Sequence, residues 1–258
     1  MPRKTIRDDE RLHFCPAVIP LRDDNPTEIR PWMTVILVLA NLATWFLVQG
    51  GGASMEALEA SVFAFGTYPC EITGACPPKG LGATAVLTSM FMHGGWGHLL
   101  GNLLFLWVFG NNIEDSMGHL RFLVFYLLCG VLAGAAHVLL SPQSSLPAVG
   151  ASGAIGGIMG AYILLYPRVR IRTWIPPFFF FNLSALFVLG YWFVLQIIMA
   201  SVSLGPEVGE QGGVAVWAHI GGFVTGLLLI RLFEKPQLVE AKRAGVQLSR
   251  EEVARLEW

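Results

Sequence analysis

The sequence predicts an all-α protein whose helices cross a membrane several times. Of its 258 residues, 54% are hydrophobic and only 14% are charged, whereas ordinary soluble domains carry about 25% charged residues. No charged residue occurs in residues 122–167 or 173–206. Each of these runs is long enough for a membrane helix, which needs about 20 apolar residues. A soluble enzyme is therefore excluded as a description of the whole chain.

The charge balance also limits the partners. The net charge is −1 and no run of basic residues occurs, so nothing indicates a nucleic-acid partner. The first 31 residues are polar, whereas a signal peptide would place an apolar core much nearer the start. We therefore expect the first apolar stretch to be a retained membrane helix.

Six apolar segments predict a bundle of six membrane helices. They cover residues 32–48, 97–113, 120–140, 150–166, 178–200 and 214–233. The chain then divides into an N-terminal segment at 1–31, a membrane domain at 32–233 and a charged, helix-prone tail at 234–258.

The distribution of basic residues predicts the orientation. With the N-terminus inside, the inner segments hold 16 Lys and Arg residues and the outer loops hold only Lys79. Short cytoplasmic loops carry such an excess, so both termini are expected in the cytoplasm.

The first outer loop, residues 49–96, contains two cysteines and a short apolar stretch. Cys70 and Cys76 lie outside the cytoplasm in this topology, where an oxidising setting favours pairing. We predict a disulfide between them, with two free thiols as the alternative. Residues 83–92 are apolar but too short to span, and we expect them to lie at the membrane surface.

The few polar residues inside the segments fall at one depth. The second, fourth and sixth segments all run from outside to inside, so their first turns lie together just below the outer surface. These turns carry His98 and Asn102, Ser152, and His219. A nucleophilic serine needs a base within about 2.6–3.2 Å and donors for a developing oxyanion.

Spacing supports a shared site. His98 and Asn102 are four residues apart and share a helix face. Glycines follow Ser152 and His219 on the same faces, at 156, 160, 222 and 226, and small residues let membrane helices approach closely. Each feature alone has a structural alternative, since Ser152 could be a helix N-cap and Asn102 could join two helices.

The sequence resembles the rhomboid family of intramembrane serine proteases. The motifs that carry the resemblance lie at residues 87–118, 150–162 and 218–226, and residues 19–27 look like the lead-in of many bacterial members. The resemblance covers about residues 19–233. It implies a bacterial inner-membrane protein with six membrane helices.

The resemblance also implies the chemistry. Ser152 would be the nucleophile and His219 the general base of a dyad, while His98, Asn102 and the Ser152 backbone N–H would form the oxyanion hole. His93 would be a supporting residue. The implied substrates are membrane proteins cut within the bilayer near the outer ends of their transmembrane segments, with no cofactor or metal. The fifth helix and the loop 201–213 would act as gate and cap.

Two positions depart from the family pattern. Many members carry Trp-Arg where this chain has Thr84 and Ala85, which puts the anchoring of the first outer loop in doubt. Many also carry an aromatic residue at the position of Gly156, stacked beneath the base. Another residue, Trp217 or Phe223 among them, must then hold the His219 ring.

Three other functions could use some of these residues or helices. Zinc could use His93, His98 and His219, but the spacing is not His-Glu-x-x-His and no carboxylate base is at hand. A transporter would carry buried carboxylates or charged pairs near the midplane. An inactive rhomboid-like protein that binds membrane clients is the nearest alternative, although it would be expected to lack the serine or the histidine.

Overall fold

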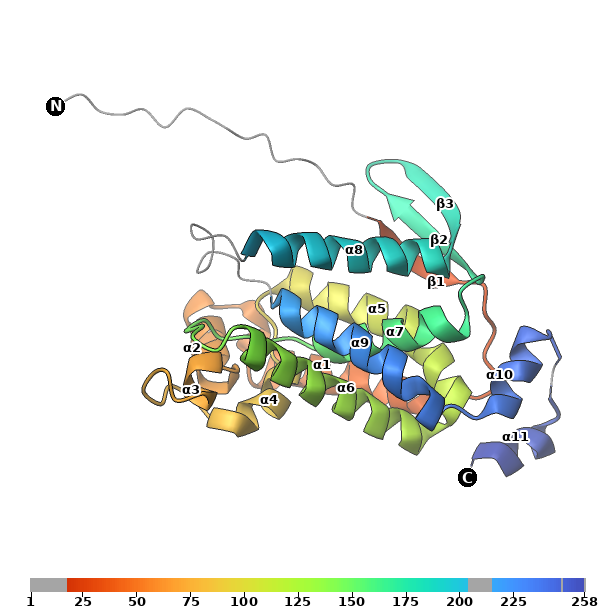
Figure 1. Cartoon of the computed structure of the whole chain (residues 1–258), viewed down its shortest axis with the longest axis horizontal. Helices are drawn as coiled ribbons and strands as arrows, with labels where there is room; N and C mark the ends of the chain where they lie inside the picture. The colour runs from red at the N-terminus through yellow and green to blue at the C-terminus, as the bar shows by residue number, and fades with distance from the viewer. Residues whose placement is uncertain (1–17, 204–214, 247, 258) are drawn as a thin grey trace.

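The computed structural model describes residues 18–203, 215–246 and 248–257, and in it long helices lie side by side in one bundle (Figure 1). The bundle helices are α1 (Trp32–Leu47), α5 (Trp96–Met117), α6 (His119–Leu140), α7 (Ser152–Leu165), α8 (Ala185–Ser203) and α9 (Val216–Phe233). Every predicted segment overlaps one of them, although α5, α6 and α8 extend beyond the predicted bounds. Residue 214 and residues 204–213 of the predicted cap lie outside the described residues.

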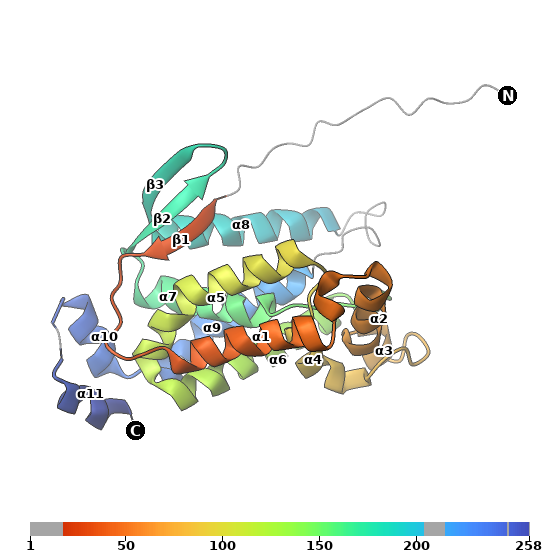
Figure 2. The ribbon, with the colours of Figure 1, turned by 180° about the vertical axis from the view of Figure 1, so that it is seen from behind.

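Short elements cover the two ends of the bundle (Figure 2). One end, here the loop end, carries α2 (Met55–Phe65), α3 (Pro69–Ile72), α4 (Ala85–Thr88) and 3₁₀ turns at Gly50–Gly52, Gly82–Thr84 and Ser89–Phe91. The opposite tail end carries α10 (Pro236–Arg243) and α11 (Arg250–Glu257).

The all-α prediction was wrong for one element, a three-stranded antiparallel sheet. Its strands are β1 (Ile19–Asp23), β2 (Arg170–Ile175) and β3 (Phe179–Ser184), in the order β1-β2-β3. The fifth predicted helix therefore begins as a strand, and α8 starts only at Ala185. Aromatic and β-branched residues favour strands, and a short apolar run does not by itself distinguish strand from helix.

The count of six membrane crossings is not confirmed. Within the described residues three helices, α6, α8 and α9, are long and apolar enough to cross a membrane. Helices α1 and α7 are apolar but have only 16 and 14 residues. Helix α5 has 22 residues, but its last part contains Glu114 and Asp115.

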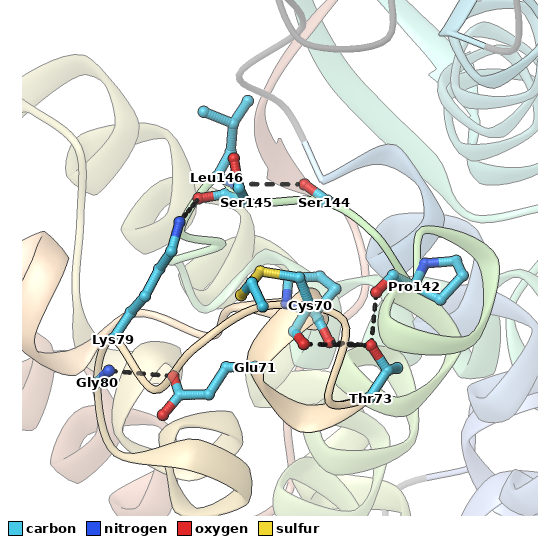
Figure 3. The surroundings of a disulfide bond; sticks show 11 residues. Cys70, Glu71, Thr73, Lys79, Gly80, Pro142, Ser144, Ser145 and Leu146 are labelled. Atoms are coloured by element: carbon cyan, nitrogen blue, oxygen red, sulfur yellow. Dashed lines mark hydrogen bonds between the residues drawn. A yellow bond between two sulfur atoms is a disulfide. The ribbon is translucent and has the colours of Figure 1, made fainter.

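A disulfide and several hydrogen bonds fix the loop end. Cys70 and Cys76 are joined, so the disulfide prediction is confirmed (Figure 3). The Thr73 hydroxyl donates to the Pro142 carbonyl at 2.6 Å, which ties α3 to the connection between α6 and α7. These contacts anchor the first loop without a contribution from the expected Trp-Arg pair, since this chain has Thr84 and Ala85 there.

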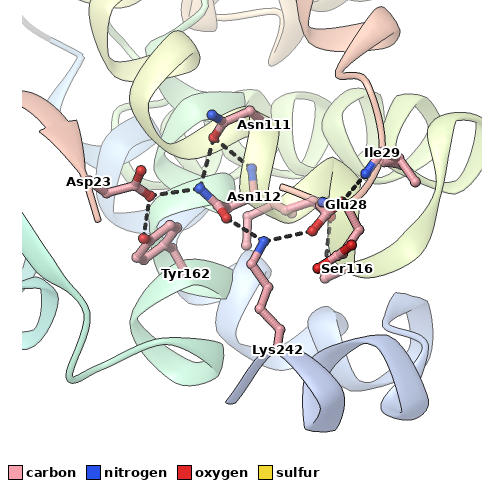
Figure 4. A network of polar contacts seen from close by, with 10 residues as sticks. Asp23, Glu28, Ile29, Asn111, Asn112, Ser116, Tyr162 and Lys242 are labelled. Carbon is pink, nitrogen blue, oxygen red and sulfur yellow. Dashed lines mark hydrogen bonds and ion pairs between the residues drawn. The ribbon is translucent and has the colours of Figure 1, made fainter. Parts of the chain in front are cut away.

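A network of buried polar groups joins the tail to the bundle (Figure 4). Lys242 of α10 donates to Asp115 at 2.6 Å and to Asn112 at 2.5 Å, and its side chain is only 6% exposed. Burial lowers the pKa of Lys242, while the neighbouring Asp115 acts in the opposite direction. The start of the tail is thus packed against α5.

Glycines set the distance between α7 and α9. A Cβ atom at Gly222 would collide with the carbonyl oxygen of Gly153, and one at Gly226 with that of Gly157. Helix α7 is buried along most of its length. The backbones of α7 and α9 can therefore touch only because these positions have no side chain.

We expect Gly226→Ala to lower the free energy of unfolding by about 1–3 kcal/mol, since an inserted methyl group must push two packed backbones apart. The measurement is thermal or denaturant unfolding of the purified protein in detergent. Gly190→Ala on α8 is the matched control, because a Cβ there meets nothing within 4 Å. Equal stability of the two variants would contradict the close contact.

Candidate active site

A cavity of about 540 Å³ opens between α5, α7, α8 and α9 near the loop end. The four residues singled out from the sequence, His98, Asn102, Ser152 and His219, all line it. They come from three helices and are spread over more than a hundred positions of the chain, so the tertiary fold brings them together.

Ser152 and His219 form a direct hydrogen bond, with 2.7 Å between Ser152 Oγ and His219 Nε2. Helix α7 begins at Ser152 and its N-cap is Ala151, with no side-chain cap. The alternative interpretation of Ser152 as an N-cap is therefore wrong. Its hydroxyl points to the imidazole across the α7–α9 contact.

Gln196 of α8 holds the other side of the imidazole. Its Oε1 lies 2.8 Å from His219 Nδ1, and an amide oxygen can only accept a hydrogen bond. Nδ1 therefore carries the proton in the neutral ring, and Nε2 is left to accept the hydroxyl proton of Ser152. This is the tautomer that a general base requires.

The ring contact expected from Trp217 or Phe223 is made by Trp192. The Trp192 and His219 ring centroids lie 5.7 Å apart, and Phe223 instead stacks on Phe193 at 4.3 Å. A Cβ at Gly156 would lie 3.0 Å from the His219 carbonyl oxygen. The contact at Gly156 is tight even for a methyl group, and the aromatic ring beside the base is supplied by Trp192 of α8.

Trp192 and Gln196 are not among the site residues predicted from the sequence, although the sequence contains a signal for them. The two residues are four apart and so share a helix face, and Gln196 is an isolated amide in an apolar stretch. Gln196 is only 7% exposed. A buried amide in a membrane helix needs a partner, but the sequence did not say which helix supplies it.

His98 and Asn102 present donors beside the backbone that leads into Ser152. The Gly94 backbone N–H donates to His98 Nδ1 at 3.2 Å, so the proton of the neutral His98 ring sits on Nε2. A Cβ built at Gly150 would lie 2.7 Å from His98 Nε2 and 3.5 Å from Asn102 Nδ2. Both donors therefore face the start of α7.

The Asn102 amide lacks a hydrogen-bond acceptor. Among the described residues its buried Nδ2 has no partner, and a buried unsatisfied donor costs about 1–3 kcal/mol. Because Asn102 also lines the cavity, the amide is free to donate to a group bound there.

His93 lies behind this pair. It is fully buried, and its ring centroid is 5.2 Å from that of His98. Gln49 fixes its backbone, accepting from the His93 N–H at 2.9 Å and donating to its carbonyl at 2.8 Å. In the part of the chain that the structure describes, no three His, Cys, Asp or Glu side chains form a group suited to a metal ion.

Comparison with known proteins gives the family. The Rhomboid domain model matches residues 82–235, which is more than half of the chain. The chain is 30% identical over 156 residues to "Rhomboid-like protein 11, chloroplastic" of Arabidopsis thaliana, covering 58% of this chain and 52% of the relative. It is 29% identical over 209 residues to "Rhomboid protease GluP" of Bacillus subtilis, covering 77% and 38%.

A third relative is matched over more of its length. "Rhomboid protease AarA" of Providencia stuartii is 28% identical over 212 residues, which cover 76% of this chain and 70% of the relative. By contrast, the chain spans about half or less of the plant and Bacillus relatives. With the domain match and the apolar helices together, the chain belongs to the rhomboid family and is an integral membrane protein.

Proposed function

We propose that the protein is an intramembrane serine endopeptidase that uses Ser152 as nucleophile and His219 as general base. The observation that carries the proposal is the 2.7 Å contact between Ser152 Oγ and His219 Nε2. It lies beside a cavity among apolar helices and needs no buried carboxylate, because Gln196 fixes the tautomer from the other side.

The proposed reaction follows from these contacts. Ser152 Oγ bonds to the carbonyl carbon of the scissile peptide while its proton passes to His219 Nε2. His98 Nε2–H, Asn102 Nδ2–H and the Ser152 backbone N–H donate to the oxyanion. His219 then protonates the departing amine, which breaks the C–N bond and leaves an acyl-serine. Water, deprotonated by His219, hydrolyses that ester and restores the serine.

The proposed topology is six membrane crossings with both termini in the cytoplasm. The Lys and Arg distribution supports it, because 16 of 17 fall in the segments that this topology places inside. The loop end with its disulfide would then face the outside, and the cavity would open near the outer ends of the transmembrane segments of membrane-protein substrates. The bacterial inner membrane is the proposed location, and α8 the proposed gate.

Labelling with a fluorophosphonate probe tests the nucleophile. We expect the wild type to be labelled, and Ser152→Ala and His219→Ala each to lose both labelling and cleavage of a membrane-protein substrate, since each removes half of the dyad. Ser54→Ala is the matched control, because this serine is exposed in the first loop and its hydroxyl accepts from the Ala57 backbone N–H. Labelling that persists in Ser152→Ala would overturn the dyad, and no labelling of the folded wild type would favour an inactive client-binding protein.

Asn102→Leu keeps much of the side-chain volume but removes the donor. We expect turnover to fall about 10–1000-fold, near the range found for one oxyanion-hole donor, with little change in KM. Asn182→Ala, an exposed position on β3, is the control. If Asn102→Leu cleaves at the wild-type rate, Asn102 serves packing only.

Gln196→Leu removes the acceptor for His219 Nδ1–H. We expect kcat to fall on the order of 100-fold, the lower part of what a positioned general base contributes, with KM little changed. Gln196→Glu keeps an accepting oxygen and should recover much of the loss, which a purely structural role would not produce. Val194→Ala, 52% exposed on the same helix, is the control. Equal rates for the Leu and Glu variants would contradict the tautomer role.

A further inference from the structure

Four consecutive phenylalanines form an exposed tip on the hairpin of β2 and β3. Phe178, Phe179, Phe180 and Phe181 are 81%, 59%, 55% and 46% exposed. The hairpin is not part of a membrane helix, and exposed apolar clusters of this kind mark sites of interaction with a protein or a membrane.

The position of the hairpin favours lipid. It connects α7 to α8, and in both ribbon views its tip lies beyond α8, away from the other bundle helices (Figures 1 and 2). The tip leans back along α8 instead of extending past the tail end, where α10 and α11 lie. Leu186 and Phe187 at the start of α8 are also 58% and 56% exposed. The phenylalanine tip therefore continues the lipid-facing surface of α8.

Arginines gather on one face of the same sheet. Arg22 of β1 is directly opposite Arg172 of β2, and Arg170 lies two residues along the strand on the same face. All three are exposed. Like charges placed directly opposite destabilise a sheet, and Asp24, at 3.9 Å from Arg22, offsets only part of this charge. An anionic surface would compensate for the remainder.

The arginine and the aromatic parts are connected. The Arg172 guanidinium lies 5.9 Å from the centroid of the Phe180 ring, within the range of a cation–π contact. Arginine can lay its aliphatic stem along apolar surface while the charged group reaches phosphate. The hairpin thus combines an apolar tip with cations placed to meet headgroups, as interfacial membrane anchors do.

We infer that the β2–β3 hairpin is a lipid anchor. Its phenylalanine tip inserts into the leaflet at the tail end of the bundle, and Arg22, Arg170 and Arg172 bind the phosphates of anionic phospholipids there. That this leaflet is the cytoplasmic one rests on the proposed topology. The anchor holds the start of α8, the helix that carries Trp192 and Gln196.

The test measures the depth of the tip in a bilayer. The full chain with Cys15→Ser and Phe180→Cys is labelled with the NBD fluorophore; Cys129 is buried and Cys70 is bonded to Cys76. It is reconstituted into vesicles of phosphatidylcholine alone or with phosphatidylglycerol, each containing lipid with a nitroxide on the acyl chain. Ala244→Cys, exposed at the end of α10, is the matched control.

We expect nitroxide quenching at position 180 to exceed that at position 244 several-fold. Phosphatidylglycerol should increase quenching at position 180. This increase should disappear in Arg170→Gln/Arg172→Gln, and inorganic phosphate added to phosphatidylcholine vesicles should not reproduce it.

Three results would overturn the anchor. Water-like emission without quenching would place the tip in solvent. Blue-shifted emission without quenching would indicate a protein partner. If phosphatidylglycerol does not increase the quenching, or if inorganic phosphate increases it equally, the anionic lipid headgroup is not the ligand of the arginines. Fluorophosphonate labelling of Ser152 on the same samples tests the proposed protease, and a C-terminal reporter tests the proposed topology. Failure of either proposal is therefore distinguishable from failure of the anchor.

Discussion

The contact between α7 and α9 is the constraint on which the rest of the site depends. A side chain at Gly222 or Gly226 would collide with carbonyl oxygens of α7, so these helices pack backbone to backbone. That distance allows a short side chain, Ser152, to reach His219 on the facing helix. In a membrane, where helix association relies on close packing and interhelical hydrogen bonds, the same contact stabilises the bundle and assembles the polar pair.

The two cavity histidines are held in opposite tautomers by different partners. Gln196 accepts from His219 Nδ1 and leaves Nε2 as an acceptor, whereas Gly94 donates to His98 Nδ1 and leaves the proton on Nε2. One ring can thus take a proton and the other can donate a hydrogen bond, without any buried charge. Two neutral histidines suit an apolar bundle, because an ionised side chain at membrane depth is costly in free energy.

Helix α8 links several features of the molecule. Its Trp192 and Gln196 contact the imidazole, and it follows directly on the hairpin whose tip is exposed phenylalanine. A Cβ at Gly156 of α7 would already lie 3.0 Å from the His219 carbonyl oxygen, and the aromatic contact with the imidazole comes from α8 instead. Displacement of α8 would therefore separate His219 from its support as well as widen the cavity.

The sequence by itself determined the membrane class, the segments that form the six long helices, and the four polar residues of the cavity. Local properties decide these features, namely apolar runs, scarce charge, and the spacing of glycines after Ser152 and His219. The sequence also predicts the Cys70–Cys76 disulfide, although the structure is what distinguishes it from two free thiols. Only the tertiary structure decided that Phe179–Ser184 is a strand. The segment is a strand because it pairs with β2, and its own composition does not reveal that partner. Likewise, Trp192 and Gln196, and not Trp217 or Phe223, contact the His219 ring because of the face that α8 turns toward α9. Hydropathy alone does not determine how a helix is oriented about its own axis.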